Sequence, residues 1–93
     1  MGIQRRIHAF ISGRVQGVFY RASAMDKAMQ LDLTGWVKNL ADGRVELVAE
    51  GSSEAIDAFI SWCRKGPPYA HVTNIEVQEQ EATGEFDRFS MRY

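Results

Sequence analysis

The chain has 93 residues, of which 45% are hydrophobic and 25% charged, and its 11 basic and 12 acidic side chains give a formal net charge of −1. This length predicts one small domain over residues 1–93, and the near-neutral charge argues against broad nucleic-acid binding, which requires a strongly basic face. The single cysteine, Cys63, excludes an internal disulfide, and no apolar run suits a membrane span or a signal peptide, so we expect a cytoplasmic protein with no membrane partner.

The first predicted element is a strand over residues 7–12, a short run of apolar and β-branched side chains that ends at Gly13. Alternation along this run gives one apolar face, made of Ile7, Ala9 and Ile11.

Residues 13–21, with the sequence Gly-Arg-Val-Gln-Gly-Val-Phe-Tyr-Arg, form the most informative segment. They hold two glycines, two arginines and no acid, and they lie between the first strand and a predicted helix. In such a loop, backbone N–H groups converge at the positive end of the helix dipole, and an arginine adds charge. The segment therefore predicts a site that binds a phosphate or a carboxylate.

The first predicted helix spans residues 21–31 and consists largely of good helix formers. Ala22, Met25, Ala28 and Met29 recur in it at helical spacing. We expect both methionines to fill the core.

Two strands follow, over residues 35–40 and 44–50. Asp42-Gly43 between them predicts a hairpin, because glycine accepts the positive φ that a tight turn needs. Alternation in the second strand gives an inward face of Val45, Leu47 and Ala49 and an outward face of Arg44, Glu46 and Glu50.

The second predicted helix has the clearest boundaries in the chain. Ser52 and Ser53 are candidate N-caps, and Gly66, followed by two prolines, ends the helix. Between these signals, an apolar stripe at helical spacing predicts the buried face, made of Ile56, Phe59, Ile60 and Cys63.

The remaining chain predicts a strand over residues 72–79, with Thr73, Ile75 and Val77 on one face, a turn over residues 81–85 and a strand over residues 88–93. The element order is β-α-β-β-α-β with a final strand. Two short helices cover only one face of a small sheet. The predicted fold class is therefore α+β, a ferredoxin-like α/β sandwich with a mostly antiparallel sheet of four to five strands and two helices on one face.

Two segments carry a resemblance to a known family. Residues 13–21 resemble the first signature of the acylphosphatase family, and residues 35–45, Gly-Trp-Val-Lys-Asn-x-x-x-Gly-x-Val, resemble its second. Gly66-Pro67-Pro68 and residues 89–93 also fit, so the resemblance covers nearly the whole chain in order. Both signatures together, in strand–loop–helix and strand–turn–strand contexts, are highly specific.

The resemblance implies hydrolysis of the carboxyl–phosphate bond of acyl phosphates, with no metal and no organic cofactor. By matched position, Arg21 would bind the phosphoryl group and Asn39 would orient the attacking water. We expect phosphate or sulfate to occupy the loop, and the protein to act as a monomer on a small-molecule substrate. The loop would hold the phosphate through the backbone N–H groups of Val15, Gln16, Gly17, Val18, Phe19 and Tyr20.

The chemistry of the two side chains agrees with these roles. Arg21 carries a permanent charge on a planar fork that matches two phosphate oxygens. Asn39 only donates and accepts hydrogen bonds, so it suits positioning rather than proton removal. Alternation places Asn39 on the same face as Val37, where a buried amide is costly unless the strand end opens to the phosphate site.

Three other interpretations compete with this one. A non-catalytic or carrier role is the first, because similar modules occur within larger hydrogenase-maturation proteins that handle carbamoyl phosphate. An RNA-binding ferredoxin-like domain is the second, but it needs several aromatic residues on a basic sheet face, and the first strand offers only Phe10. A metal site is the third, but His8 and His71 lack ligand spacing, which favours structural or solvent-facing roles.

Overall fold

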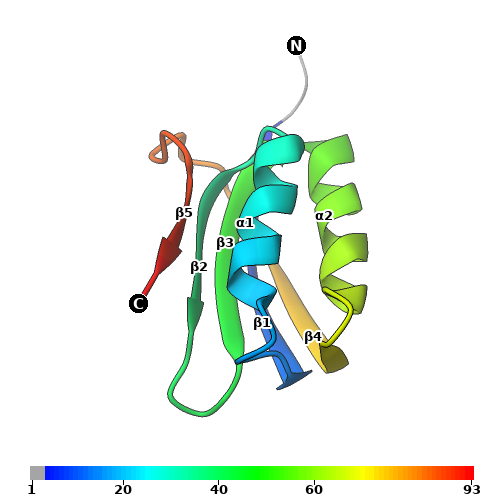
Figure 1. The fold of residues 1–93 in the computed structure, drawn as a ribbon. Helices are drawn as coiled ribbons and strands as arrows, with labels where there is room; N and C mark the ends of the chain where they lie inside the picture. Colours follow the sequence, from blue (N-terminus) through cyan, green and yellow to red (C-terminus); the bar gives the residue numbers. More distant parts are fainter. Residues whose placement is uncertain (1–3) are drawn as a thin grey trace.

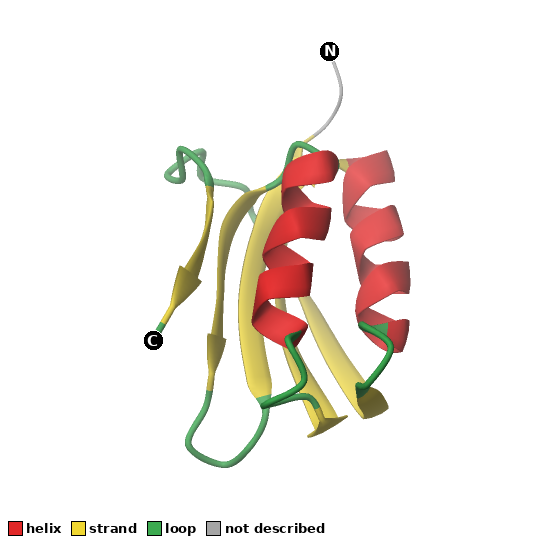
Figure 2. Cartoon of the chain, in the orientation of Figure 1, coloured by secondary structure: helices red, strands yellow, loops and turns green. Residues whose placement is uncertain are grey.

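In a computed structural model, which describes residues 4–93, the chain folds into one sheet packed against two helices (Figures 1 and 2). In chain order, the elements are β1 (Gln4–Arg14), α1 (Tyr20–Gln30), β2 (Thr34–Asn39), β3 (Val45–Ser52), α2 (Ser53–Lys65), β4 (His71–Gln80) and β5 (Phe89–Arg92).

The five strands form a mixed sheet in the order β4-β1-β3-β2-β5. The pairs β1–β3, β1–β4 and β2–β3 are antiparallel, and only β2–β5 is parallel. Both helices lie over the same face of the sheet (Figure 2). The predicted ferredoxin-like α+β fold, with two helices on one face, is confirmed.

The core lies between this face and the helices. The predicted inward faces of β1 and β3 are buried, as are Ile56, Phe59 and Cys63 of the α2 stripe. Ile60 is only partly buried and packs against this cluster. Each fully buried large apolar side chain contributes about 1.5–3 kcal/mol relative to an exposed one, so these faces determine the register of the sheet.

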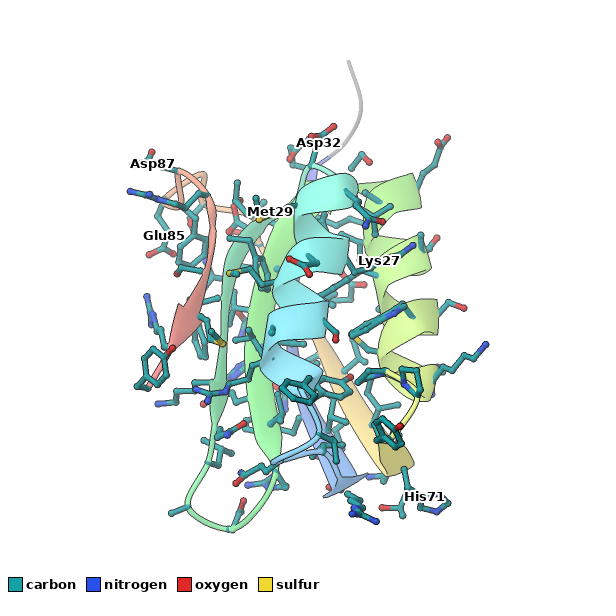
Figure 3. The ribbon with its side chains drawn as sticks, in the orientation of Figure 1. Lys27, Met29, Asp32, His71, Glu85 and Asp87 are labelled. Carbon is teal, nitrogen blue, oxygen red and sulfur yellow. The ribbon has the colours of Figure 1, made fainter. Side chains whose placement is uncertain are left out.

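The predicted role of Met29 in the core is wrong. Met29, near the C-terminal end of α1, is 59% exposed (Figure 3). The buried residues of α1 are Tyr20, Ala24 and Ala28, which recur every four residues. Met29 follows Tyr20 by two and a half turns at 3.6 residues per turn, which places it on the opposite side of α1, whereas Met25 is partly buried against the core.

The predicted ends of α2 are confirmed. Ser52 is the N-cap, and its side chain accepts a hydrogen bond of 3.2 Å from the backbone N–H of Ala55. Gly66 is the C-cap, with φ 71°, and its N–H donates to the Trp62 carbonyl at 2.8 Å. Local capping chemistry therefore fixes the length of this helix.

A β-bulge changes the predicted faces of β4. Ser12 pairs with Asn74 but Gly13 pairs with Val72, so Thr73 is the extra residue and is exposed, while Val72 packs against the core. Gly13 has φ +119°, and a Cβ there would lie 2.1 Å from the His71 carbonyl oxygen. The bulge therefore requires glycine at position 13, immediately before the loop to α1.

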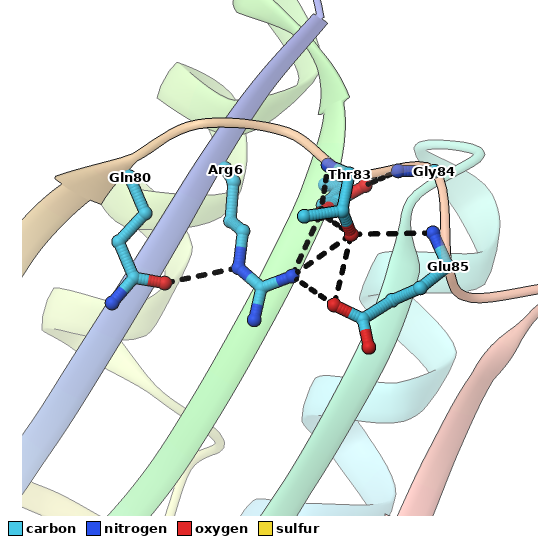
Figure 4. A network of polar contacts seen from close by, with 6 residues as sticks. Arg6, Gln80, Thr83, Gly84 and Glu85 are labelled. Atoms are coloured by element: carbon cyan, nitrogen blue, oxygen red, sulfur yellow. Dashed lines mark hydrogen bonds and ion pairs between the residues drawn. The ribbon is translucent and has the colours of Figure 1, made fainter.

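Glu50 lies on the face of β3 opposite the core residue Ala49, as alternation predicts, but it is only 4% exposed because the segment between β4 and β5 covers it. Three of its hydrogen-bond donors, Arg6, Thr83 and Gly84, are labelled in Figure 4. Glu50 accepts hydrogen bonds of 3.0 Å each from the backbone N–H groups of Thr83 and Gly84 and from the guanidinium of Arg6. Burial alone would raise the pKa of Glu50, but these donors together hold it below its ordinary value. The segment between β4 and β5 thus covers this part of the sheet and encloses a carboxylate whose charge is paired and hydrogen-bonded.

Candidate active site

The loop that joins β1 to α1 and the hairpin that joins β2 to β3 lie at the same end of the sheet (Figure 1). Both contribute to one cavity of about 280 Å³. Its lining residues are Val15, Gln16, Gly17, Phe19, Tyr20, Arg21, Ala22, Asn39 and Met91. The structure therefore brings every predicted site residue except Val18 to a single cavity, although they come from separate segments of the chain.

Val18 instead anchors the loop, because its side chain is buried in the core. The residues on either side of Val18 have left-handed backbone conformations, with φ 74° at Gly17 and φ 65° at Phe19. Glycine adopts such a φ without penalty, whereas a bulky residue such as Phe19 is strained by about 1–2 kcal/mol. The loop therefore keeps its shape at an energetic cost.

The backbone donors of this loop are not used by the rest of the fold. Within residues 4–93, no N–H group of residues 15–20 donates a hydrogen bond to another group of the protein. The N-cap of α1, Phe19, supplies no side-chain hydrogen bond, and the first turn of this helix contains no acid. A helix N-terminus with unsatisfied N–H groups and no compensating carboxylate attracts an anion.

Arg21, in the first turn of α1, is held beside the cavity by the end of β5. One guanidinium nitrogen, Nη1, donates to the Arg92 carbonyl at 2.9 Å, and the guanidinium carbon lies 4.8 Å from the centre of the Tyr93 ring. This leaves most of the guanidinium donors available to a phosphate. The sequence predicted Arg21 but not these two contacts, because they join residues about 70 positions apart.

Asn39 is the last residue of β2, and it lines the cavity at the strand end. Its Oδ1 atom is buried, and it has no hydrogen-bond partner within the described residues 4–93. An unsatisfied buried acceptor costs about 1–3 kcal/mol. Within the described residues, this acceptor lacks the partner that buried polar atoms usually have.

The side chain of Gln16 joins the loop to the hairpin beside Asn39. Its Nε2 group donates to the carbonyls of Leu40 and Arg44, at 2.8 and 2.9 Å. The same two hairpin residues are joined by a backbone hydrogen bond of 2.8 Å from Leu40 to Arg44. The sequence predicts a role only for the Gln16 backbone, because no local pattern indicates this side-chain contact.

Tyr20 fixes the other side of the loop to the core. It is fully buried, and its hydroxyl donates to the Cys63 carbonyl at 2.8 Å. Burial raises the pKa of the Tyr20 hydroxyl far above its ordinary value, and burial raises the pKa of the Cys63 thiol to about 12. Both groups are therefore neutral at pH 7 and hold the structure, as a core position for Cys63 predicts.

The two histidines lie away from the cavity. His8 pairs with Glu46 at 2.6 Å on the sheet face that the helices leave uncovered, and His71 is exposed at the start of β4 (Figure 3). Within residues 4–93, no three His, Cys, Asp or Glu side chains are placed to hold a metal ion together. In the same part of the chain, no helix has the length and apolar character to cross a membrane.

The uncovered sheet face is the surface that an RNA-binding domain of this fold would use. Its aromatic rings already have partners within the chain, since the Arg44 guanidinium lies 4.8 Å from the centre of the Phe10 ring and that of Arg92 lies 4.6 Å from Trp36. Stacking of RNA bases would have to displace these cations. The geometry therefore favours the cavity, and not this face, as the functional site.

Known proteins resemble this chain over a range that includes the residues of the cavity. The family model described as Acylphosphatase matches residues 7–91. An acylphosphatase of Methylococcus capsulatus is 60% identical over 87 residues, which cover 94% of this chain and 95% of that protein. The crystal structure of acylphosphatase from Bacillus subtilis has a TM-score of 0.92 and 39% identity, over 96% of this chain and 99% of that chain.

The same fold also occurs as a small part of a longer protein. HypF of T. kodakarensis matches 96% of this chain with a TM-score of 0.83 and 36% identity, but the match covers only 12% of HypF. The M. capsulatus and B. subtilis proteins, in contrast, are matched over almost their full lengths. From the family model, these relatives and the shared fold, we conclude that the chain belongs to the acylphosphatase family.

Proposed function

We propose that the protein hydrolyses the carboxyl–phosphate bond of acyl phosphates, giving a carboxylate and inorganic phosphate. The observation that carries this proposal is the composition of the cavity. Anion donors, the loop N–H groups and Arg21, lie there together with the unsatisfied Oδ1 atom of Asn39. Membership of the acylphosphatase family supports the same reaction.

The phosphoryl group is bound by the loop and by Arg21. Successive N–H groups of residues 15–20, with the α1 dipole behind them, hold the phosphoryl oxygens. The Arg21 guanidinium, oriented by the Arg92 carbonyl, adds a fixed positive charge. Phosphoryl transfer requires mainly such stabilisation of the equatorial oxygens, so these donors contribute most in the transition state.

The attacking water is bound by Asn39. Its Oδ1 atom accepts a hydrogen bond from the water and directs the water oxygen toward phosphorus. A bond forms between the water oxygen and phosphorus, and the bond between phosphorus and the acyl oxygen breaks. The carboxylate leaves, and a phosphoryl oxygen of the substrate takes the proton from the water.

The loop N–H groups and Arg21 stabilise the negative charge on the phosphoryl oxygens, and the reaction requires no metal ion or organic cofactor. A carboxylate is a good leaving group, so no strong general acid is required at the acyl oxygen. We propose that one domain, acting as a monomer, performs the whole reaction. Inorganic phosphate and sulfate, which resemble the phosphoryl end of the substrate, are expected to bind the same loop as competitive inhibitors.

Turnover of acetyl phosphate by the purified chain tests the proposal. We expect release of acetate and phosphate well above the rate in buffer, unchanged by EDTA and inhibited competitively by phosphate. Binding of phosphate without turnover would contradict the enzyme and support the carrier role instead. Loss of activity in EDTA would contradict a metal-free reaction.

A further inference from the structure

Phe19 is an unusual residue for the position it occupies. Its side chain is 76% exposed, whereas Phe59 and Phe89 are buried in the core. Phe19 also has φ 65°, a conformation that glycine or asparagine adopts easily and a bulky aromatic residue rarely does. Neither folding nor packing explains an exposed, strained phenylalanine, and such outliers are typical of functional sites.

The position of Phe19 relates this residue to the substrate. Phe19 lines the same cavity as Arg21 and Asn39, and Ala22 and Met91 add further apolar surface to the lining. An acyl phosphate has two ends, and the polar part of the cavity suits only the phosphoryl end. The acyl group must therefore contact the apolar part.

The distribution of charge in the cavity also indicates an apolar acyl group. Among the described residues that line the cavity, Arg21 is the only one with a charged side chain, and the phosphoryl group requires it. No second lining cation is present to pair with a charged acyl group. The cavity therefore favours acyl groups that are uncharged and apolar.

We propose that Phe19 is the acyl-binding residue and that the preferred substrates carry an apolar acyl group, above all a flat aromatic one. This inference depends on the proposed hydrolysis of acyl phosphates. The exposed ring of Phe19 stacks on an aromatic acyl group, or covers an aliphatic one, once the phosphoryl group is bound. The side chain of Phe19 thus determines specificity, while its backbone N–H group belongs to the phosphate-binding loop.

The test compares kcat/KM for benzoyl phosphate and acetyl phosphate in the wild type and in Phe19→Ala. We expect the substitution to lower kcat/KM for benzoyl phosphate about tenfold more than kcat/KM for acetyl phosphate, because acetyl has no ring to stack. Phe19→Tyr, which keeps the ring, should retain the wild-type values. Tyr69→Ala serves as the matched control, since Tyr69 is 77% exposed and outside the cavity lining.

Phe19→Gly separates a binding role from a folding defect. Glycine accepts φ 65° without strain, so this variant should melt at or above the wild-type temperature and still lose benzoyl phosphate turnover selectively. Equal losses for the two substrates, or the same selectivity in Phe19→Ala as in the wild type, would overturn the inference. A wild type inactive on both substrates would instead contradict the proposed hydrolysis itself.

Discussion

At one end of the sheet the Glu50 carboxylate is buried and accepts hydrogen bonds from Arg6 and from two backbone N–H groups of the β4–β5 segment (Figure 4). At the other end the Oδ1 atom of Asn39 is also buried, but it has no hydrogen-bond partner within residues 4–93. The loop beside Asn39 leaves its N–H groups unused and strains its backbone at Phe19. The first end satisfies its polar groups internally, and the second does not.

This difference separates the end of the sheet that stabilises the fold from the end at which we propose that a ligand binds. Polar groups satisfied within the fold contribute to the free energy of unfolding but are unavailable to a substrate. Polar groups that the fold leaves without partners do not stabilise it, but they are available to a ligand, as polar groups of active sites commonly are. Substitutions at the first end should therefore change stability alone, and substitutions at the second end should change catalysis.

The largest expected change in stability follows from Glu50→Gln. The substitution removes the charge that Arg6 pairs with and places an amide NH₂ group among N–H donors. We expect the free energy of unfolding, measured in urea, to fall by about 3 kcal/mol, with kcat unchanged while the protein remains folded. Glu81→Gln, at an exposed carboxylate of the same segment, is the control and should change neither quantity.

The pH dependence sharpens this prediction. The hydrogen-bonded donors hold the pKa of Glu50 in the folded protein below the ordinary value of 4.5. Its contribution to stability is therefore complete above about pH 4.5 and is lost as the pH falls through the lowered pKa. The difference between wild type and Glu50→Gln should be constant at neutral pH and shrink in acid. A kcat that fell with stability at pH 7 would contradict the separation of the two ends.

A smaller effect, on catalysis, is expected from Gln16→Leu. The Gln16 side chain donates to Leu40 and Arg44, so its loss should loosen the hairpin that carries Asn39. We expect kcat to fall about tenfold while phosphate still binds, because displacement of a positioning group is costly even when the group remains present. Steady-state kinetics with phosphate as inhibitor separate the two quantities.

The same substitution on the exposed part of β4, Gln78→Leu, provides the control. It should leave kcat and the phosphate inhibition constant unchanged. If Gln16→Leu gave the same result as Gln78→Leu, the hairpin would be rigid without Gln16, and its side chain would have no part in positioning Asn39.

Local patterns were sufficient to predict most of the fold. Ser52 and Gly66 define α2 through capping, and Asp42-Gly43 lies in the hairpin between β2 and β3. The failures at Glu50 and Thr73 concern interactions between distant parts of the chain. The burial of Glu50 depends on donors more than 30 positions away, and the exposure of Thr73 depends on how β4 pairs with Gly13.

The candidate site was predictable for a different reason. The two family signatures name Arg21 and Asn39, and the structure places both at one cavity. Neither signature shows that Gln16 joins the loop to the hairpin or that Arg92 orients Arg21. Each of these contacts joins a side chain to a backbone carbonyl that comes close only after the sheet has formed, and no spacing along the sequence encodes it.

We propose that the loop and Arg21 hold the phosphate while Asn39 directs the water, and one comparison of variants tests this division of roles most directly. Phosphate inhibition and kcat are measured together for Asn39→Ala and Arg21→Ala, with acetyl phosphate as substrate. Arg21→Ala should weaken phosphate binding and lower kcat.

Asn39→Ala is the decisive variant. Its kcat should fall about 10²-fold or more, because the water loses its position, while the phosphate inhibition constant stays within twofold of the wild type. Its melting temperature should not fall, since the substitution removes an unsatisfied buried acceptor. A near-normal kcat in Asn39→Ala, or a loss of phosphate affinity as large as in Arg21→Ala, would contradict the separate roles proposed for Asn39 and Arg21.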